Sequence, residues 1–102
     1  GKHPKKRMSS IVALLSVEMH FPEAHSLKEK RMLLRRVKDR LKKFNIATAE
    51  VEHLDKWQRT QIGIVTVSNT RIAVDQALNS AIDEIERVQP GLITRTQVDF
   101  LT

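Results

Sequence analysis

Hydrophobic residues along the chain follow two helical patterns and four strand patterns. Residues 26–43 and 69–88 repeat apolar positions every three or four residues, which is the spacing of one helix face. Four other segments are short apolar runs or alternate between apolar and polar residues, as strands do. Those segments are residues 10–20, 45–54, 58–68 and 92–101. The predicted order along the chain is therefore strand, helix, strand, strand, helix, strand.

The ends of the two helices carry signals of their own. Ser26 and Glu29 form a capping box before the first helix, since a hydroxyl and a carboxylate three residues apart can each accept from a free amide. Asn69 or Ser68 is expected to cap the second helix, which ends before the Gln-Pro-Gly of residues 89–91. The apolar stripes are Leu27, Leu34, Val37, Leu41 and Phe44 in the first helix, and Ile72, Val74, Leu78, Ile82 and Ile85 in the second.

This order of elements, with right-handed crossovers, predicts an α/β (α+β) fold of the ferredoxin-like type. Four strands form an antiparallel sheet in the spatial order 4-1-3-2, and both helices cover one face of it. A single domain spans residues 8–102, because a chain of this length has the usual size of one hydrophobic core. The other face of the sheet is left uncovered.

The uncovered face of the sheet is expected to be apolar, with Glu18, Glu50 and Glu52 beside it. A monomer rarely leaves such a patch exposed, so we expect a homodimer in which a second copy of the chain covers it. An adaptor surface for another protein is the alternative. The apolar residues are Val12 and Leu14, or Ile11, Ala13 and Leu15, from the first strand, and Ile62 and Ile64, or Val65 and Val67, from the third.

Composition excludes several classes of protein. The chain has no cysteine, which excludes a disulfide scaffold, a cysteine zinc site and a thiol nucleophile. No apolar run approaches the roughly 18–20 residues of a membrane-spanning helix, and we expect a cytoplasmic protein. Neither a glycine-rich phosphate loop nor a nucleophile elbow occurs. We therefore expect a non-enzymatic protein and assign no catalytic residue.

Positive charge is concentrated in two short segments. The net charge is +6, yet residues 26–44 alone carry nine basic and two acidic residues. Residues 1–7 add four more basic residues, and are either a native basic arm or the remnant of an expression tag. The rest of the chain is acidic overall. One basic helix on an acidic body is the predicted charge distribution.

Five cations of the basic helix recur at spacings of three and four residues and so share one side of it. Aligned cations suit the phosphate backbone of RNA, because each neutralised phosphate releases counterions. We interpret this stripe as a contact with RNA or the ribosome. The alternatives are an acidic protein partner, or a solvated face paired with acids of the second helix such as Asp83, Glu84 and Glu86. The stripe is Lys28, Arg31, Arg35, Lys38 and Lys42, and Arg36, Arg40 and Lys43 lie on the outer face.

One edge of the predicted sheet collects most of the histidines and the only tryptophan. The ends of the first two strands meet the start of the third strand there. A small ligand or a partner can bind at such an edge, an enzymatic site can lie there as the alternative to a non-enzymatic protein, or the side chains simply pack. No two histidines have the short spacing of a metal-ligand pair, so we predict no metal and no cofactor. The residues are His20, His25, His53, Asp55, Trp57 and Arg59, with Phe21 and Gln58 beside them.

Three segments of the chain, residues 17–31, 49–59 and 67–69, resemble the YlxP-like family of bacterial proteins, a domain of unknown function. The most specific parts are the Pro-x-x-x-Ser-Leu-Lys-x-Lys-Arg run that begins at Pro22 and the Asp-x-Trp-Gln-Arg run that begins at Asp55. The resemblance implies a ferredoxin-like fold and supplies no activity and no catalytic residue. Genes of that family often lie beside those for transcription elongation, translation initiation factor two and ribosome-binding factor A. By this association, the resemblance implies a role near translation or ribosome maturation.

Overall fold

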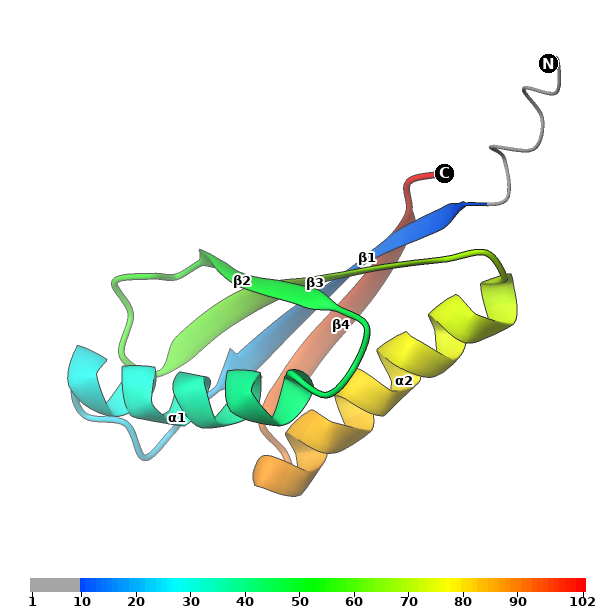
Figure 1. Ribbon diagram of the computed structural model, residues 1–102. Coiled ribbons are helices and arrows are strands. Elements are labelled where there is room, and N and C mark those ends of the chain that lie inside the picture. Colours follow the sequence, from blue (N-terminus) through cyan, green and yellow to red (C-terminus); the bar gives the residue numbers. More distant parts are fainter. Residues whose placement is uncertain (1–9) are drawn as a thin grey trace, which may run out of the picture.

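The computed structural model describes residues 10–102, so the basic stretch of residues 1–7 lies outside the described part of the chain. Four antiparallel strands form one sheet in the order β2-β3-β1-β4, and Figure 1 shows both helices packed on the same side of it. The predicted ferredoxin-like fold and strand order are confirmed. The elements are β1 (Ile11–His20), α1 (Leu27–Leu41), β2 (Ala47–Glu52), β3 (Arg59–Ser68), α2 (Arg71–Val88) and β4 (Ile93–Phe100).

The hydrophobic core lies between the helices and one face of the two central strands. Alternate residues of β1, from Ala13 to Met19, are buried on the helix side, because side chains alternate between the faces of a strand. β3 adds Ile62 and Ile64 to the same layer. The helices add Leu34, Val37 and Leu41 from α1, and Val74, Leu78, Ala81 and Ile85 from α2.

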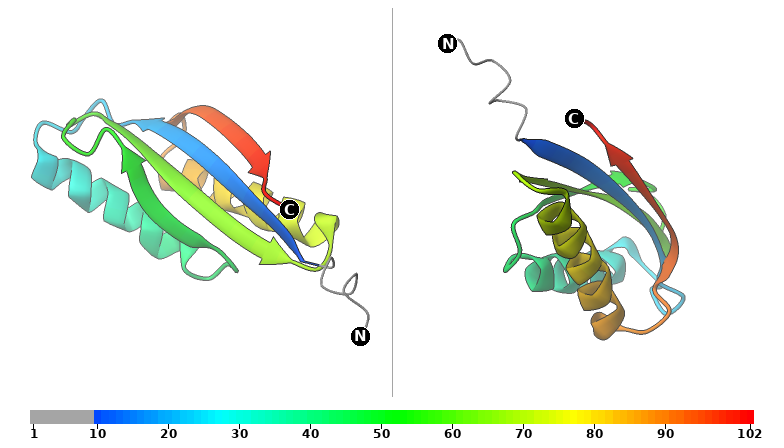
Figure 2. Two further views of the ribbon diagram at one scale, coloured as in Figure 1. Left: turned by 90° about the horizontal axis from the view of Figure 1, so that it is seen from above. Right: turned by 90° about the vertical axis from the view of Figure 1, so that its right-hand side faces the viewer.

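The open face of the sheet carries Val12, Leu14, Val51, Val65 and Val67, a set that we call the open face from here on. Of the alternatives that the alternation leaves, the one with Val12, Leu14, Val65 and Val67 is correct, because their neighbours in β1 and β3 point into the core. Both further views show no helix over this side of the sheet (Figure 2). Glu50 was expected beside the open face and lies instead on the helix side, where it meets Lys30.

Both helices begin at side-chain caps. The Ser26 hydroxyl accepts from the backbone N–H of Glu29 at 3.1 Å, as the capping box predicts. Thr70 caps α2, where its hydroxyl accepts from the N–H of Ala73 at 3.1 Å. The expected cap at Asn69 or Ser68 is therefore wrong by one or two residues.

The predicted apolar stripe of α2 is wrong at Ile72, whose side chain is 70% exposed. Only two positions separate Ile72 from Val74, and a helix turns about 100° per residue, so the two side chains point to different sides. The buried stripe begins at Val74 and continues through Leu78, Ala81 and Ile85.

Candidate functional site

Helix α1 carries a basic face, by which we mean Lys28, Arg31, Arg35, Lys38 and Lys42. Lys28, Arg31 and Arg35 are exposed, and Lys38 is half-buried. Within residues 10–102, none of these four cations forms an ion pair. Lys42 pairs with Asp39 at 3.1 Å, and because both are exposed, water weakens this attraction. The basic face therefore keeps most of its charge available to a partner.

A groove of about 260 Å³ runs beside the basic face, between α1 and β2. Arg31, Arg35 and Lys38 line it together with Leu34 and Glu50. The carboxylate of Glu50 is already engaged by other groups of the protein, so the three cations dominate the charge of the groove.

Lys30 is the one cation of α1 that lies in the core. Its side chain is 1% exposed, and its Nζ lies 2.8 Å from Oε2 of Glu50 and 2.6 Å from the carbonyl oxygen of His53, to which it donates. Thr60 donates a second hydrogen bond to the same Glu50 oxygen. The ion pair joins α1 to β2 and to the turn that follows β2.

Glu84 of α2 gathers three cations around a side chain that is 2% exposed. Its oxygens lie 3.0 Å from Nη1 of Arg40, 3.2 Å from Nζ of Lys43 and 3.1 Å from Nη1 of Arg87. The hydrogen bond from Arg40, followed by that from Lys43, holds the pKa of the Glu84 carboxyl below its ordinary value, and burial opposes this only in part. Arg40 and Lys43, expected on the outer basic face, are thus paired with an acid of the second helix.

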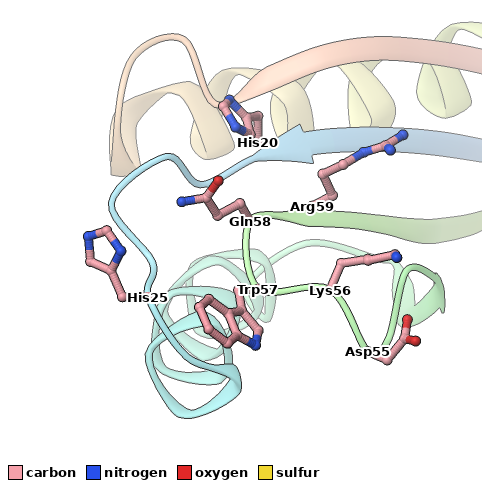
Figure 3. A pocket seen from close by; sticks show the side chains of 7 residues that line it. All are labelled: His20, His25, Asp55, Lys56, Trp57, Gln58 and Arg59. Atoms are coloured by element: carbon pink, nitrogen blue, oxygen red, sulfur yellow. The ribbon is translucent and has the colours of Figure 1, made fainter.

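A pocket of about 550 Å³ opens where the loop after β1 meets the loop before β3. Figure 3 shows the Trp57 indole at its mouth, with Lys56 and Arg59 extending to one side and His25 on the other. Trp57 is 53% exposed, a large fraction for the only tryptophan of the chain. The lining residues are His20, His25, Asp55, Lys56, Trp57, Gln58 and Arg59.

His53 does not line this pocket, although the sequence grouped it with the other edge residues. It adopts a left-handed backbone conformation, with φ of 62°, in the turn after β2. Its carbonyl oxygen accepts from Lys30 and from the backbone N–H of Lys56, at 2.6 and 3.0 Å. The role of His53 in the structure is to shape the turn. Phe21, also grouped with this edge, is buried in the core.

The far end of the same loop is tied to the loop after β1. Nε2 of Gln58 donates to the carbonyl oxygens of Pro22 and Ala24, at 3.0 and 3.2 Å. The backbone N–H of Phe21 donates to the carbonyl of Gln58 at 2.8 Å. Residues 53–58 are therefore held at both ends, and Trp57 lies between the two anchors.

The described part of the chain offers no cluster of three metal-ligating side chains. Among residues 10–102, no helix has the length and apolar character needed to cross a membrane.

Fold and surface together define a small ferredoxin-like α/β protein with one basic helix and one aromatic pocket. The chain belongs to the family described as "Protein of unknown function (DUF503)", which matches residues 12–98. It is 40% identical over 82 residues to "Uncharacterized protein YlxP" of Bacillus subtilis (strain 168), which covers 74% of this chain and 85% of that protein. The predicted resemblance to the YlxP-like family is confirmed, and it brings no known activity with it.

Two structures show likeness in fold alone. The de novo designed protein Ferredog-Diesel is similar with a TM-score of 0.57 and 16% identity, covering 86% of this chain and 83% of its own. A conserved protein from Methanosarcina mazei Go1 is similar with a TM-score of 0.54 and 12% identity, covering 93% and 95%.

Sequence reasoning missed two features of the site. Lys30 occupies a core position, because the residues at 30, 34, 37 and 41 follow the helical spacing of the buried face. A lysine at an apolar-stripe position in the sequence could have indicated a buried ion pair. Lys56 is not among the edge residues named from the sequence, and nothing in its local pattern indicates that it lines a pocket.

Proposed function

We propose that this protein is a non-enzymatic cytoplasmic protein that binds RNA, alone or within the ribosome, through the basic face of α1. The basic face extends over about 20 Å, given the rise of about 1.5 Å per helical residue. Its cations can each neutralise a phosphate, and the release of counterions supplies the free energy of binding.

The observation that supports this proposal is that the two buried carboxylates next to α1 pair with cations outside the basic face. Glu84 is bound by Arg40 and Lys43, and Glu50 is bound by Lys30. Neither of these two carboxylates pairs with the basic face within the described residues. Only Lys42 of the basic face has an internal counter-ion, Asp39, and a mostly unpaired cationic surface attracts a polyanion more strongly than one that is already neutralised.

Replacement of Arg31 and Arg35 by Gln is expected to weaken RNA binding and to lower its salt dependence. Each lost phosphate contact reduces the slope of log K against log salt by about 0.7 for a single strand, so the pair reduces it by about 1.4. Fluorescence anisotropy with a labelled ribosomal RNA fragment, over a range of salt concentrations, measures this slope. Reversal of Arg31, Arg35 and Lys38 to Glu is expected to abolish binding.

The matched control replaces Arg71 and Arg87 by Gln, since both are exposed, lie in α2 and belong neither to the basic face nor to the open face. It makes the same change of net charge and is expected to leave the slope nearly unchanged. Equal effects of the two pairs would contradict a specific basic face, and unchanged binding by the triple reversal would contradict RNA binding through α1.

We also propose that the protein forms a homodimer through the open face. Val65 and Val67 of β3 are 37% and 49% exposed there, although they lie in the middle of the sheet. Charges of both signs border them, from Glu18 on β1 to Arg95 and Asp99 on β4. A border that carries both signs can complement itself across a twofold axis.

Substitution Val65→Glu is expected to convert the dimer to a monomer, because it buries two carboxylates, one from each copy, in an apolar contact where they repel each other and lose their hydration. The matched control is Val98→Glu, at a valine of β4 that is 45% exposed on the helix side of the sheet. Light scattering is expected to give twice the chain mass of 11.7 kDa for the wild type and for the control. A wild type of single chain mass would contradict the homodimer and leave the face to an adaptor function.

A further inference from the structure

We propose that the pocket around Trp57 is a nucleotide site, in which a base stacks on the indole and the phosphate is bound by Lys56 and Arg59. The inference rests on the proposed RNA binding in that it names the part of the RNA recognised, an unpaired nucleotide. The same chemistry is present in a free mononucleotide, and the experiment below separates the two sources.

The aromatic half of the site is Trp57. Its side chain is 53% exposed and lines the pocket, so the indole is accessible to a ligand there. Bases stack on such side chains whatever their sequence, because every base has a π-face. The volume of about 550 Å³ lies within the usual range of about 300–1,000 Å³ for small-molecule sites.

The charged half of the site is cationic. Lys56 and Arg59 both line the pocket, both are exposed, and neither forms an ion pair within residues 10–102. Figure 3 shows them on the same side of Trp57, with Asp55 as the one carboxylate of the lining. A ligand that is flat and aromatic at one end and anionic at the other matches this arrangement, and a nucleotide has that form.

The platform is held in place before any ligand arrives. Lys30 fixes the turn before Trp57 through the carbonyl of His53, and Gln58 fixes the chain after it through Pro22 and Ala24. A loop that is already ordered costs little conformational entropy on binding. The buried lysine is therefore a positioning residue for the pocket as well as a part of the core.

The pocket lies at the N-terminal end of α1, where the basic face begins. His25 lines the pocket and Lys28 belongs to the first turn of the helix. Figure 3 shows the indole in front of the first turns of α1, and Figure 1 shows the loop before β3 beside the same end of the helix. A single RNA strand along the basic face can thus place one nucleotide in the pocket.

Intrinsic fluorescence tests the site directly, because the chain has one tryptophan and no tyrosine. Titration with adenosine monophosphate is expected to quench Trp57 saturably, whereas ribose 5-phosphate, which lacks the base, is expected to leave it unchanged. The wild type is expected to bind adenosine monophosphate more tightly than adenosine, as measured by the same quenching. Substitution of Lys56 and Arg59 by Gln is expected to make the two affinities equal. Absence of quenching by both the monophosphate and a single-stranded oligoadenylate overturns the proposal.

The RNA arm uses anisotropy, which does not depend on the tryptophan signal. Trp57→Ala is expected to weaken single-stranded oligoadenylate binding about tenfold, while Trp57→Phe retains most of it and duplex RNA is bound equally by all three proteins. Ile72→Ala, at another exposed apolar residue, is the control and is expected to bind like the wild type. Unchanged oligoadenylate affinity in Trp57→Ala overturns the assignment to RNA.

These experiments can contradict the nucleotide site at Trp57 and RNA binding by the basic face independently of each other. If Trp57 gives no response while Arg31 and Arg35 still set the salt slope, the pocket proposal is wrong and RNA binding by the basic face stands. If adenosine monophosphate quenches Trp57 while RNA affinity is independent of Arg31 and Arg35, RNA binding by α1 is wrong and the pocket serves a free nucleotide. Circular dichroism of each variant confirms that it is folded before it is compared.

Discussion

Lys30→Met is expected to lower the free energy of unfolding by about 3 kcal/mol, because it leaves Glu50 without its counter-charge beside the core. The carboxylate lies 2.8 Å from Nζ and its side chain is 17% exposed, so water replaces the lost ammonium only in part. The carbonyl of His53 loses a hydrogen bond at the same time. Urea denaturation followed by circular dichroism measures the loss.

Two further variants distinguish the contribution of the ion pair to stability from that of the packing of the Lys30 side chain. Lys28→Met, in the same helix but exposed, is expected to change stability by less than about 0.5 kcal/mol. The double variant Lys30→Met with Glu50→Leu is expected to recover most of the loss, since apolar side chains can replace a whole buried pair. A loss below about 0.5 kcal/mol in Lys30→Met would contradict the buried ion pair.

Glu84→Gln is expected to destabilise the protein at neutral pH and to have a smaller effect as the pH is lowered. The pKa of Glu84 is lowered in the folded protein, first by Arg40 and then by Lys43. A carboxyl with a lowered pKa stabilises the fold above its unfolded pKa of about 4.5, and this contribution is lost as the pH falls through the folded pKa. The sign follows from the unfolded chain binding the proton more tightly.

Thermal unfolding at pH 7 and at pH 3 tests this pH dependence. At pH 7 the melting temperature of Glu84→Gln is expected to lie below that of the wild type, because Arg40, Lys43 and Arg87 are left to repel one another. At pH 3 the difference is expected to be smaller than at pH 7, because the wild-type carboxyl gains protons as the pH falls below about 4.5. Asp83→Asn, a neighbouring acid that forms no ion pair in the described structure, is expected to match the wild type at both values. A difference that is the same at both pH values would contradict the assigned role of Glu84.

The elements and their buried faces could be predicted from the sequence because both depend on neighbours a few positions apart. The alternation of β1 and the spacing of Leu34, Val37 and Leu41 are properties of short segments, and the structure preserves them. The predictions for α2 were wrong at the residue that caps it and at one residue of its buried face. Thr70 caps α2 in place of Asn69, and Ile72 is exposed although its apolar side chain suggested the core.

The candidate site was predictable only in outline. The topology brought His20, His25 and Trp57 to one end of the sheet, as expected from the strand order. It did not indicate that His53 turns its carbonyl toward α1 or that Lys56 lines the pocket, because a loop conformation depends on its anchors. One of those anchors is Lys30, which lies 23 positions earlier in the chain than His53.

The amino-acid pattern alone establishes a ferredoxin-like domain, its strand order and a helix with an excess of positive charge, since periodicity and charge are local properties. The sequence did not determine which cations of this helix form ion pairs within the protein and which stay unpaired at the surface. Lys30 is neutralised in the core and Arg40 and Lys43 by Glu84, while Arg31 and Arg35 keep their charge. The physical reason is that ion pairs join residues far apart in the chain, so only the packing of α1 against β2 and α2 determines which charges reach solvent unpaired.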